Sequence, residues 1–328
     1  MFIGVDGGGT KTAFILLSPQ AQVLARAEGG TAYHPQVGLE AVREVLRTGL
    51  AELLRRAQLP ASAVRHAFFG LPAYGEDPAL DPQLALVPRV TLAAGQYSCG
   101  NDMICGWAGA LGCADGISVT AGTGSIAYGE FDGRAARAGG WGEVFGDEGS
   151  AYWIGREGLA AFSRMSDGRS RPGPLQDLLR RHFGIAHDLE LAGRINSPGS
   201  AGRSLIAQLA RVIANAAHAG DAAARGIFER AAFELAALVH ATRALLQVPG
   251  QRELPVSYSG GVFDSGALVL EPFRTQLLRG QLPYRLQSPA FPPVVGAALY
   301  AARAAAVRFS DTQLDSLAAT LNQEGSTR

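Results

Sequence analysis

The sequence contains little cysteine, and its thiols are poorly placed to hold a metal. Its 328 residues include only Cys99, Cys105 and Cys113. Their spacing does not match the common zinc or iron–sulfur motifs, and no histidine lies near them in the sequence. We therefore expect buried, reduced thiols, as in a reducing compartment, rather than a metal centre or a disulfide framework.

The chain also lacks an excess of charge of either sign. Lys+Arg and Asp+Glu both number 29, so the formal net charge is zero, and Lys11 is the only lysine. A balanced chain offers no overall electrostatic attraction to nucleic acid or to an anionic membrane. We therefore expect neither a nucleic-acid partner nor a membrane partner.

Long apolar runs are missing as well. No segment reaches the length of a transmembrane helix, and Met1 runs directly into a strand-like segment rather than into a signal peptide. Hydrophobic residues still make up 47% of the sequence, which is enough for about two ordinary cores at this length. These features predict a cytoplasmic protein of two domains.

Two turns rich in glycine and threonine are the most informative feature that the sequence does contain. The first is Asp6-Gly7-Gly8-Gly9-Thr10-Lys11-Thr12 and the second is Thr120-Ala121-Gly122-Thr123-Gly124-Ser125. Each separates two apolar runs and is typical of a β-hairpin. Glycines let backbone amides approach an anion, hydroxyls add donors, and Asp6 suits a Mg²⁺ ion or its water shell. A single such hairpin is usually only a turn, but the pair predicts a phosphate site.

Neither turn matches two other nucleotide motifs. Gly4 and Gly9 have the spacing of a P-loop, but Thr10 stands where the lysine belongs, and a strand follows rather than a helix. The dinucleotide fingerprint fails because no helix opens at the glycines.

Apolar spacing predicts that the chain has two similarly organised halves. In the first half we expect strands at 2–5, 13–17, 23–27, 66–71 and 89–92, and helices at 38–54 and 103–111. In the second half we expect strands at 117–119, 127–131, 135–139 and 254–259, and helices at 151–162, 205–219, 222–246 and 293–306. The glycine-containing turn at 112–116 sets the boundary, which gives domains 1–114 and 115–328.

Several segments together resemble the N-acetylglucosamine kinase branch of the superfamily that joins sugar kinases, heat-shock chaperone ATPases and actin. They are Asp6–Thr10, Asn101-Asp102, Ala121–Ser125 and Gly139–Trp153, the last being the most specific. The resemblance extends to Gly260-Gly261 and so covers nearly the whole chain. It implies an α/β fold of two ribonuclease-H-like, actin-like ATPase domains, with ATP, Mg²⁺ and an amino sugar bound in a cleft between them. It also allows a homodimer.

The resemblance further implies roles for individual residues. Asp102 would be the general base that accepts the proton of the sugar 6-hydroxyl, although capping of the helix at 103–111 is its commoner role on spacing alone. Asp6 would lie at the metal. The implied sugar contacts are Asn101, Asp102, Gly140, Trp141 and Asp147, whereas we expect Ser150 to cap a helix and Trp153 to lie in the core. The implied nucleotide-binding residues are Gly7, Gly8, Gly9, Thr10, Lys11, Thr12, Gly122, Thr123, Gly124, Ser125, Gly260 and Gly261.

Departures from the family pattern leave the sugar open. Tyr33 and Ile126 stand where animal-type relatives carry asparagines that contact the sugar, and His34 is a possible replacement contact. We expect an ATP-dependent kinase that makes N-acetylglucosamine 6-phosphate, with glucosamine and N-acetylmuramic acid as alternative acceptors.

Two other classes of protein remain as alternatives. The related ATPases that activate benzoyl-CoA reductase and 2-hydroxyglutaryl-CoA dehydratase hold an iron–sulfur cluster with cysteines placed after the second turn, whereas all the cysteines here precede it. A sugar-sensing repressor would carry an N-terminal helix-turn-helix, whereas this chain begins at its first strand.

Overall fold

The structure is a computed structural model that describes residues 1–196 and 202–325, and it divides into two compact units. Unit 1 comprises Met1–Ala114 and Ser288–Arg328, and unit 2 comprises Asp115–Gln287. Residues 288–328 therefore belong with the first unit and not, as expected from the sequence, with a domain 115–328. The physical reason is close packing of two helices, because a Cβ added at Gly296 would overlap the backbone of Gly109.

A mixed sheet forms the centre of unit 1. Its strands lie in the order β3-β2-β1-β4-β5, with antiparallel pairing along β3-β2-β1 and parallel pairing along β1-β4-β5. The strands are β1 (Phe2–Gly7), β2 (Thr12–Leu17), β3 (Val23–Gly29), β4 (His66–Leu71) and β5 (Tyr97–Asn101).

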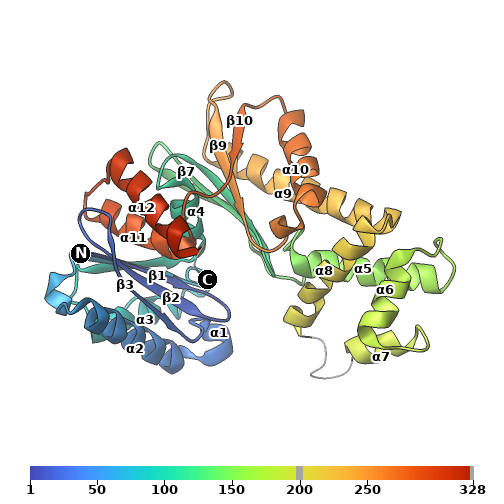
Figure 1. The fold of residues 1–328 in the computed structure, drawn as a ribbon, viewed down its shortest axis with the longest axis horizontal. Helices are drawn as coiled ribbons and strands as arrows, with labels where there is room; N and C mark the ends of the chain where they lie inside the picture. The colour runs from blue at the N-terminus through green and yellow to red at the C-terminus, as the bar shows by residue number, and fades with distance from the viewer. Residues whose placement is uncertain (197–201, 326–328) are drawn as a thin grey trace. The chain divides into compact units, whose positions relative to one another are not determined.

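Helices cover both faces of this sheet, as Figure 1 shows for α2 on one face and α11 on the other. Strand residues alternate between the faces, so Phe14 and Leu16 share a core with Leu46 of α2, while Ile15 shares one with Val295 of α11. The helices of unit 1 are α1 (His34–Val37), α2 (Leu39–Ala57), α3 (Asp81–Leu84), α4 (Met103–Leu111), α11 (Pro293–Ala304) and α12 (Asp311–Gly325).

One predicted strand of unit 1 is wrong. Residues 89–92 are not extended, since Val87–Val90 forms a 3₁₀ turn in which Val90 is exposed. The edge strand is instead β5, which pairs with β4 through Ala67–Leu71 and ends at Asn101. Asp102 therefore follows directly on a strand of the sheet and immediately precedes α4.

The sheet of unit 2 repeats the arrangement of the first. Its order is β10-β9-β6-β7-β8, with antiparallel pairing along β6-β7-β8 and parallel pairing along β6-β9-β10. The strands are β6 (Gly116–Ala121), β7 (Ser125–Phe131), β8 (Arg134–Gly139), β9 (Leu254–Ser259) and β10 (Tyr284–Gln287).

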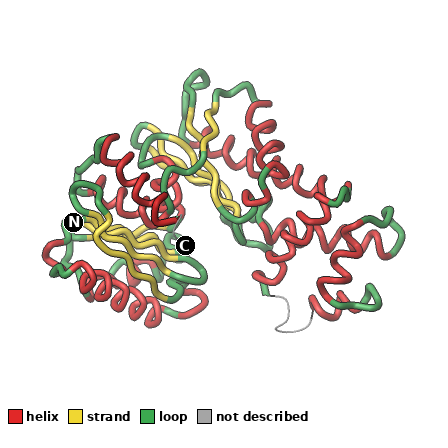
Figure 2. The backbone as a smooth tube through the Cα atoms, in the orientation of Figure 1, coloured by secondary structure: helices red, strands yellow, loops and turns green. Residues whose placement is uncertain are grey.

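Unit 2 differs from unit 1 in its long helical insertion, seen beyond one end of its sheet in Figure 2. The helices are α5 (Ala151–Ser166), α6 (Pro174–Phe183), α7 (Glu190–Asn196), α8 (Arg203–His218), α9 (Ala222–Leu245) and α10 (Ala267–Arg279). Ser150 caps α5, since its Oγ accepts a hydrogen bond from the Trp153 amide at 3.1 Å, and Trp153 is buried, so both expectations are confirmed. Within residues 1–196 and 202–325, no helix is long and apolar enough to cross a membrane.

Candidate active site

The first Gly/Thr turn is the predicted hairpin between β1 and β2. The Gly8 amide donates to the Lys11 carbonyl at 2.9 Å, while Gly9, Thr10 and Lys11 are exposed. Gly7 and Thr12 are buried, and the Thr12 hydroxyl donates to the Gly30 carbonyl at 2.8 Å. The exposed tip of the turn is therefore open to a ligand, whereas Gly7 and Thr12 support it from beneath.

The register of the sheet brings Asp6 and Asp102 close together. Asp6 pairs with Gly70 of the neighbouring strand, and a Cβ added at Gly70 would lie 3.2 Å from the Asp102 Cα. Both carboxylates are only partly exposed. Burial, reinforced by the charge of Asp102 and opposed by Lys11, raises the pKa of Asp6 to about 7. Burial also raises the pKa of Asp102 to about 6, opposed by the Met103 backbone amide and reinforced by the charge of Glu76.

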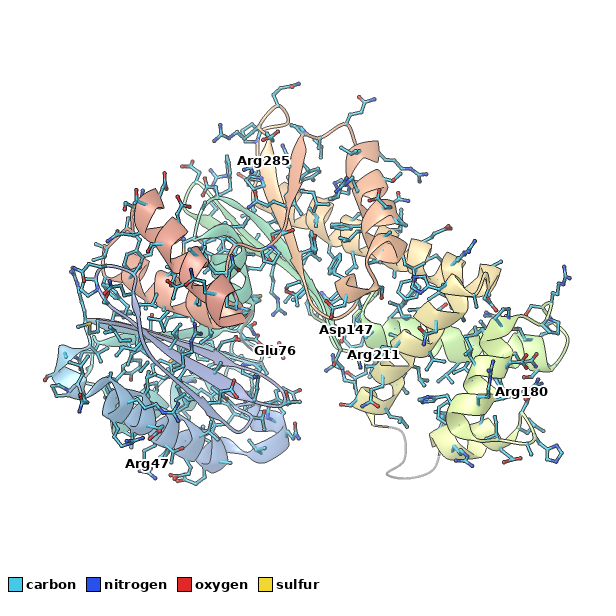
Figure 3. All side chains as sticks on the ribbon, viewed as in Figure 1. Arg47, Glu76, Asp147, Arg180, Arg211 and Arg285 are labelled. Carbon is cyan, nitrogen blue, oxygen red and sulfur yellow. The ribbon has the colours of Figure 1, made fainter. Side chains whose placement is uncertain are left out.

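Asn101, rather than Asp102, provides the capping contact at the start of α4. Asp102 makes no side-chain capping hydrogen bond, and the Met103 amide donates to Oδ1 of Asn101 at 3.1 Å. Asn101 Nδ2 also donates to the Tyr74 carbonyl at 3.1 Å, which ties the end of β5 to the loop that carries Glu76 (Figure 3). Asp102 thus occupies the N-cap position without a capping hydrogen bond that meets ordinary geometry, although the Met103 amide lowers the pKa of its carboxyl.

The two carboxylates suit a magnesium ion. Within the described part of the chain, no group of three or more His, Cys, Asp or Glu side chains could hold a metal. Mg²⁺ commonly takes only one or two protein carboxylates, because water and substrate phosphates complete its shell. Asp6 and Asp102 repel each other when both are ionised, and a divalent cation would relieve that repulsion.

The second Gly/Thr turn connects β6 to β7 and is supported on several sides. The Ala151 amide at the start of α5 donates to the Gly122 carbonyl at 2.8 Å, and the Ser125 hydroxyl donates to the Glu148 carbonyl at 2.7 Å. Thr123 at its tip is exposed. The Ser125 side chain is thus occupied within the protein, and Thr123 is the hydroxyl that the turn presents to solvent.

Gly260 lies directly against the second turn. Its φ of +96° favours glycine, and an added Cβ would lie 2.9 Å from the Gly122 amide nitrogen and overlap the Ala121 carbonyl. The Val262 amide also donates to that carbonyl at 3.0 Å. The structure therefore brings together Gly260 and the second turn, which are separated by more than a hundred residues of sequence.

The Gly139–Trp153 segment runs from the last residue of β8 to the first turn of α5, and the loop between them contains both exposed and buried residues. Trp141 is 64% exposed and the Arg137 guanidinium lies 5.8 Å from its ring centroid. Asp147 is 3% exposed, and its Oδ1 accepts a hydrogen bond from the Ser125 amide at 3.3 Å. Gly140 has a φ of +71° and packs on Ile126, where an added Cβ would lie 2.7 Å from Cδ1.

Sequence reasoning missed Arg203, which forms an ion pair with Asp147. Arg203 is the first residue of α8, far from either turn in the sequence, and no motif marks it. On the side of the first turn, the Thr31 hydroxyl donates to the Gly8 carbonyl at 2.8 Å, so the segment that contains Tyr33 and His34 is tied to the turn. His34 is buried, and within the described residues its Nδ1 has no hydrogen-bond partner.

The duplicated sheet and the paired turns define a protein of the actin-like ATPase fold. The chain belongs to the BadF/BadG/BcrA/BcrD ATPase family, whose model matches residues 3–301.

Named relatives of the chain include sugar kinases. N-acetyl-D-glucosamine kinase of Dictyostelium discoideum is 26% identical, with 92% of this chain and 97% of that protein covered. N-acetylmuramic acid/N-acetylglucosamine kinase of Clostridium acetobutylicum is 30% identical, with 83% of this chain and 88% of that protein covered. The solved structure of a candidate N-acetylglucosamine kinase from Chromobacterium violaceum has a TM-score of 0.69 and 30% identity. The match covers 90% of this chain and 97% of that one.

Proposed function

We propose that this protein is an ATP-dependent amino-sugar kinase that converts N-acetylglucosamine to its 6-phosphate. The observation that carries the proposal is the Asp6–Asp102 pair, in which Asp102 is partly buried, has a raised pKa and makes no capping hydrogen bond. The names of the relatives from Dictyostelium and Clostridium support the same reaction class.

Asp102 would act as the general base. As the sugar 6-oxygen forms its bond to the γ-phosphorus, its proton passes to the Asp102 carboxylate, and the bond from the γ-phosphorus to the bridging oxygen of ADP breaks. A pKa of about 6 leaves this carboxylate mostly ionised at neutral pH, yet more basic than an ordinary aspartate. Mg²⁺, when bound near Asp6, would offset charge on the phosphates.

Each unit, taken by itself, carries residues that we propose bind substrate. In unit 1, we propose that the exposed tip Gly9-Thr10-Lys11 meets phosphate together with the half-buried Gly8, with Gly7 and Thr12 beneath them. In unit 2, we propose that the second turn and Gly260-Gly261 bind the nucleotide, because they are packed together. The nucleotide-binding residues of unit 2 would then be Gly122, Thr123, Gly124, Ser125, Gly260 and Gly261.

For the sugar we propose contacts from Asn101, Asp102, Gly140, Trp141 and Asp147. The exposed ring of Trp141 can offer an apolar platform to a sugar face. Asn101 and Asp147 are engaged within the protein, so their contribution would be to hold neighbouring backbone in place as well as to meet the sugar.

A coupled ADP-release assay tests the proposal. Purified protein with ATP and Mg²⁺ should release ADP when N-acetylglucosamine is added, and the assay should be repeated with glucosamine, N-acetylmuramic acid, glucose and no sugar. Strong stimulation by glucosamine or N-acetylmuramic acid instead would keep the kinase and change its acceptor. ADP release independent of any sugar, together with iron in the purified protein, would favour an activator ATPase.

A further inference from the structure

A cation at the start of α8 lies on the second Gly/Thr turn. The Nη2 atom of Arg203 forms an ion pair with Oδ2 of Asp147, and its Nε lies 3.3 Å from Oε2 of Glu143. The Arg203 side chain is 35% exposed, so its head is shared between protein and solvent. Figure 3 labels Asp147, which lies in the loop before α5, and Arg211, which lies on α8, the helix that begins at Arg203.

Gly124 leaves the space that the Arg203 guanidinium occupies. A Cβ added at Gly124 would lie 2.7 Å from Arg203 Nη2 and 2.8 Å from Asp147 Oδ2. Both distances are shorter than a carbon atom can tolerate at a polar neighbour. The charged head therefore lies against the backbone of the turn itself rather than merely near it.

Two carboxylates hold the guanidinium in this position. Asp147 adopts a left-handed backbone conformation, with φ of +56°, and its side chain links the Ser125 amide to Arg203. Glu143 approaches from the preceding part of the same loop. Within the described residues, Nη2 pairs with Asp147, while Nε approaches Glu143 but is buried without a hydrogen-bond partner, so the hydrogen-bonding capacity of the guanidinium is only partly used by these two carboxylates.

We propose that Arg203 is a catalytic residue that binds a terminal phosphate of the nucleotide at the second turn. The proposal rests on the nucleotide site of the proposed function. A planar guanidinium offers several donors to phosphate oxygens, and a cation fixed in advance stabilises charge without further reorganisation. Arg203 neither makes nor breaks a bond: the sugar oxygen bonds to the γ-phosphorus, the proton goes to Asp102, and ADP leaves with the electron pair of the broken bond.

Calorimetric titration of the full chain with nucleotides tests this role without any sugar. Adenosine, ADP and the non-hydrolysable ATP analogue AMPPNP would be titrated, each with Mg²⁺, into the wild type and Arg203→Gln. We expect the Kd of AMPPNP to rise about tenfold in the variant, the loss of roughly one charged hydrogen bond, while the Kd of adenosine stays within about twofold. Equal weakening of all three ligands, or of none, would overturn the proposal.

Arg211→Gln is the matched control, because Arg211 is an exposed arginine of the same helix. This variant should bind adenosine, ADP and AMPPNP with wild-type affinity. If Arg203→Gln does not fold, as judged by its melting curve, Arg203→Lys carries the same test. It keeps the charge but loses the planar fork, so it should weaken AMPPNP by about threefold and adenosine not at all.

Steady-state kinetics separate phosphate binding from a purely structural role through Asp147. With the sugar acceptor identified, Arg203→Gln should lower kcat by about 10²-fold or more and leave the sugar KM within about threefold. A large rise in sugar KM with unchanged kcat would assign Arg203 to positioning Asp147 and reject the proposal. If no sugar stimulates ADP release but Arg203→Gln still weakens AMPPNP selectively, the proposed function fails while the phosphate contact stands.

Discussion

The two Gly/Thr turns are similar in sequence and differ in how the protein supports them. The first turn rests on hydroxyl-to-carbonyl hydrogen bonds from Thr12 and Thr31, and its one cation, Lys11, pairs at the surface with Glu28. The second turn is contacted by Gly260, by the start of α5 and by the Asp147–Arg203 ion pair. The charged groups beside them differ as well: two partly buried carboxylates, Asp6 and Asp102, lie by the first turn, whereas the carboxylate of Asp147 by the second turn is paired with the Arg203 guanidinium.

This difference indicates that the two turns, although similar in sequence, act through different neighbouring groups. A surface ion pair such as Lys11–Glu28, with both side chains about two-thirds exposed, is screened by solvent and contributes little. A guanidinium packed on the backbone by a buried carboxylate is already positioned for a ligand. We therefore expect changes beside the first turn to act through Asp6 and Asp102, and changes beside the second to act through packing and Arg203.

The largest expected effect comes from Asp102→Asn, which removes the proton acceptor beside the first turn. We expect kcat to fall by about 10²- to 10⁴-fold, the usual contribution of a general base, while sugar binding measured by calorimetry stays nearly unchanged. Asp311→Asn, an exposed substitution on α12, is the control and should keep full activity. Near-normal turnover of Asp102→Asn would contradict the assignment of the base.

A glycine exchange tests the tighter support of the second turn. Gly260→Ala forces a side chain into a left-handed backbone position and against the Ala121 carbonyl, so we expect a loss of about 2 kcal/mol in the free energy of unfolding. An added Cβ at Gly9 meets no atom of the described chain within 4 Å. The free energy of unfolding of Gly9→Ala should therefore lie within about 0.5 kcal/mol of the wild-type value. Urea denaturation of the two variants compares them, and equal stabilities would remove the distinction between the turns.

Acidification should protonate the Asp102 carboxylate beside the first turn and so lower the rate. Because the pKa of Asp102 is raised to about 6, kcat/KM should fall about tenfold per pH unit below pH 6, whereas an ordinary aspartate would stay ionised down to pH 4. AMPPNP binding, which we propose depends on the guanidinium of Arg203, should change less over the same range. A flat rate profile between pH 5 and pH 7 would contradict the shift.

The same pKa shift predicts the pH dependence of stability. The folded-state pKa of Asp102 lies above the ordinary aspartate value of 3.8, so its favourable contribution to stability is complete below about pH 4 and is lost as the pH rises through 6. Asp102→Asn cannot titrate, so the variant does not lose this stability as the pH rises. The Tm of the variant relative to the wild type, measured without Mg²⁺, should therefore increase from pH 4 to pH 7. A constant difference in Tm would show that the carboxyl does not titrate in this window.

Local patterns predicted much of this architecture. The helix expected at 222–246 is α9, and both hairpins were found because apolar runs flank glycine-rich turns. The edge strand β5 was missed because Ser98, Cys99 and Gly100 show no alternation of apolar and polar residues, and the strand is stabilised by pairing with β4. Local patterns could not predict the position of α11 in unit 1 either, because it depends on contact between Gly296 and Gly109, nearly two hundred residues apart.

The site was predictable only where chemistry coincides with a local motif. Asp6 and Asp102 each adjoin a strand end, and they come together because β4 pairs with β1 on one side and with β5 on the other. Arg203 has no such marker, because its role depends on where the helical insertion returns to the second turn. A single arginine in an arginine-rich chain gives no signal of its own.

The smallest expected effect concerns Lys11, the only lysine and the cation closest in sequence to the first turn. Lys11→Gln removes the exposed pair with Glu28, which should cost less than about 0.5 kcal/mol of unfolding free energy. Its charge also opposes the rise in the Asp6 pKa, so its loss should raise that pKa slightly and increase the Mg²⁺ concentration needed for half-maximal rate by less than about threefold. Magnesium titrations of the wild type and the variant measure this. If Lys11→Gln lowered kcat as much as is expected for Arg203→Gln, Lys11 would have to leave Glu28 and bind phosphate. The two turns would then use their cations in the same way.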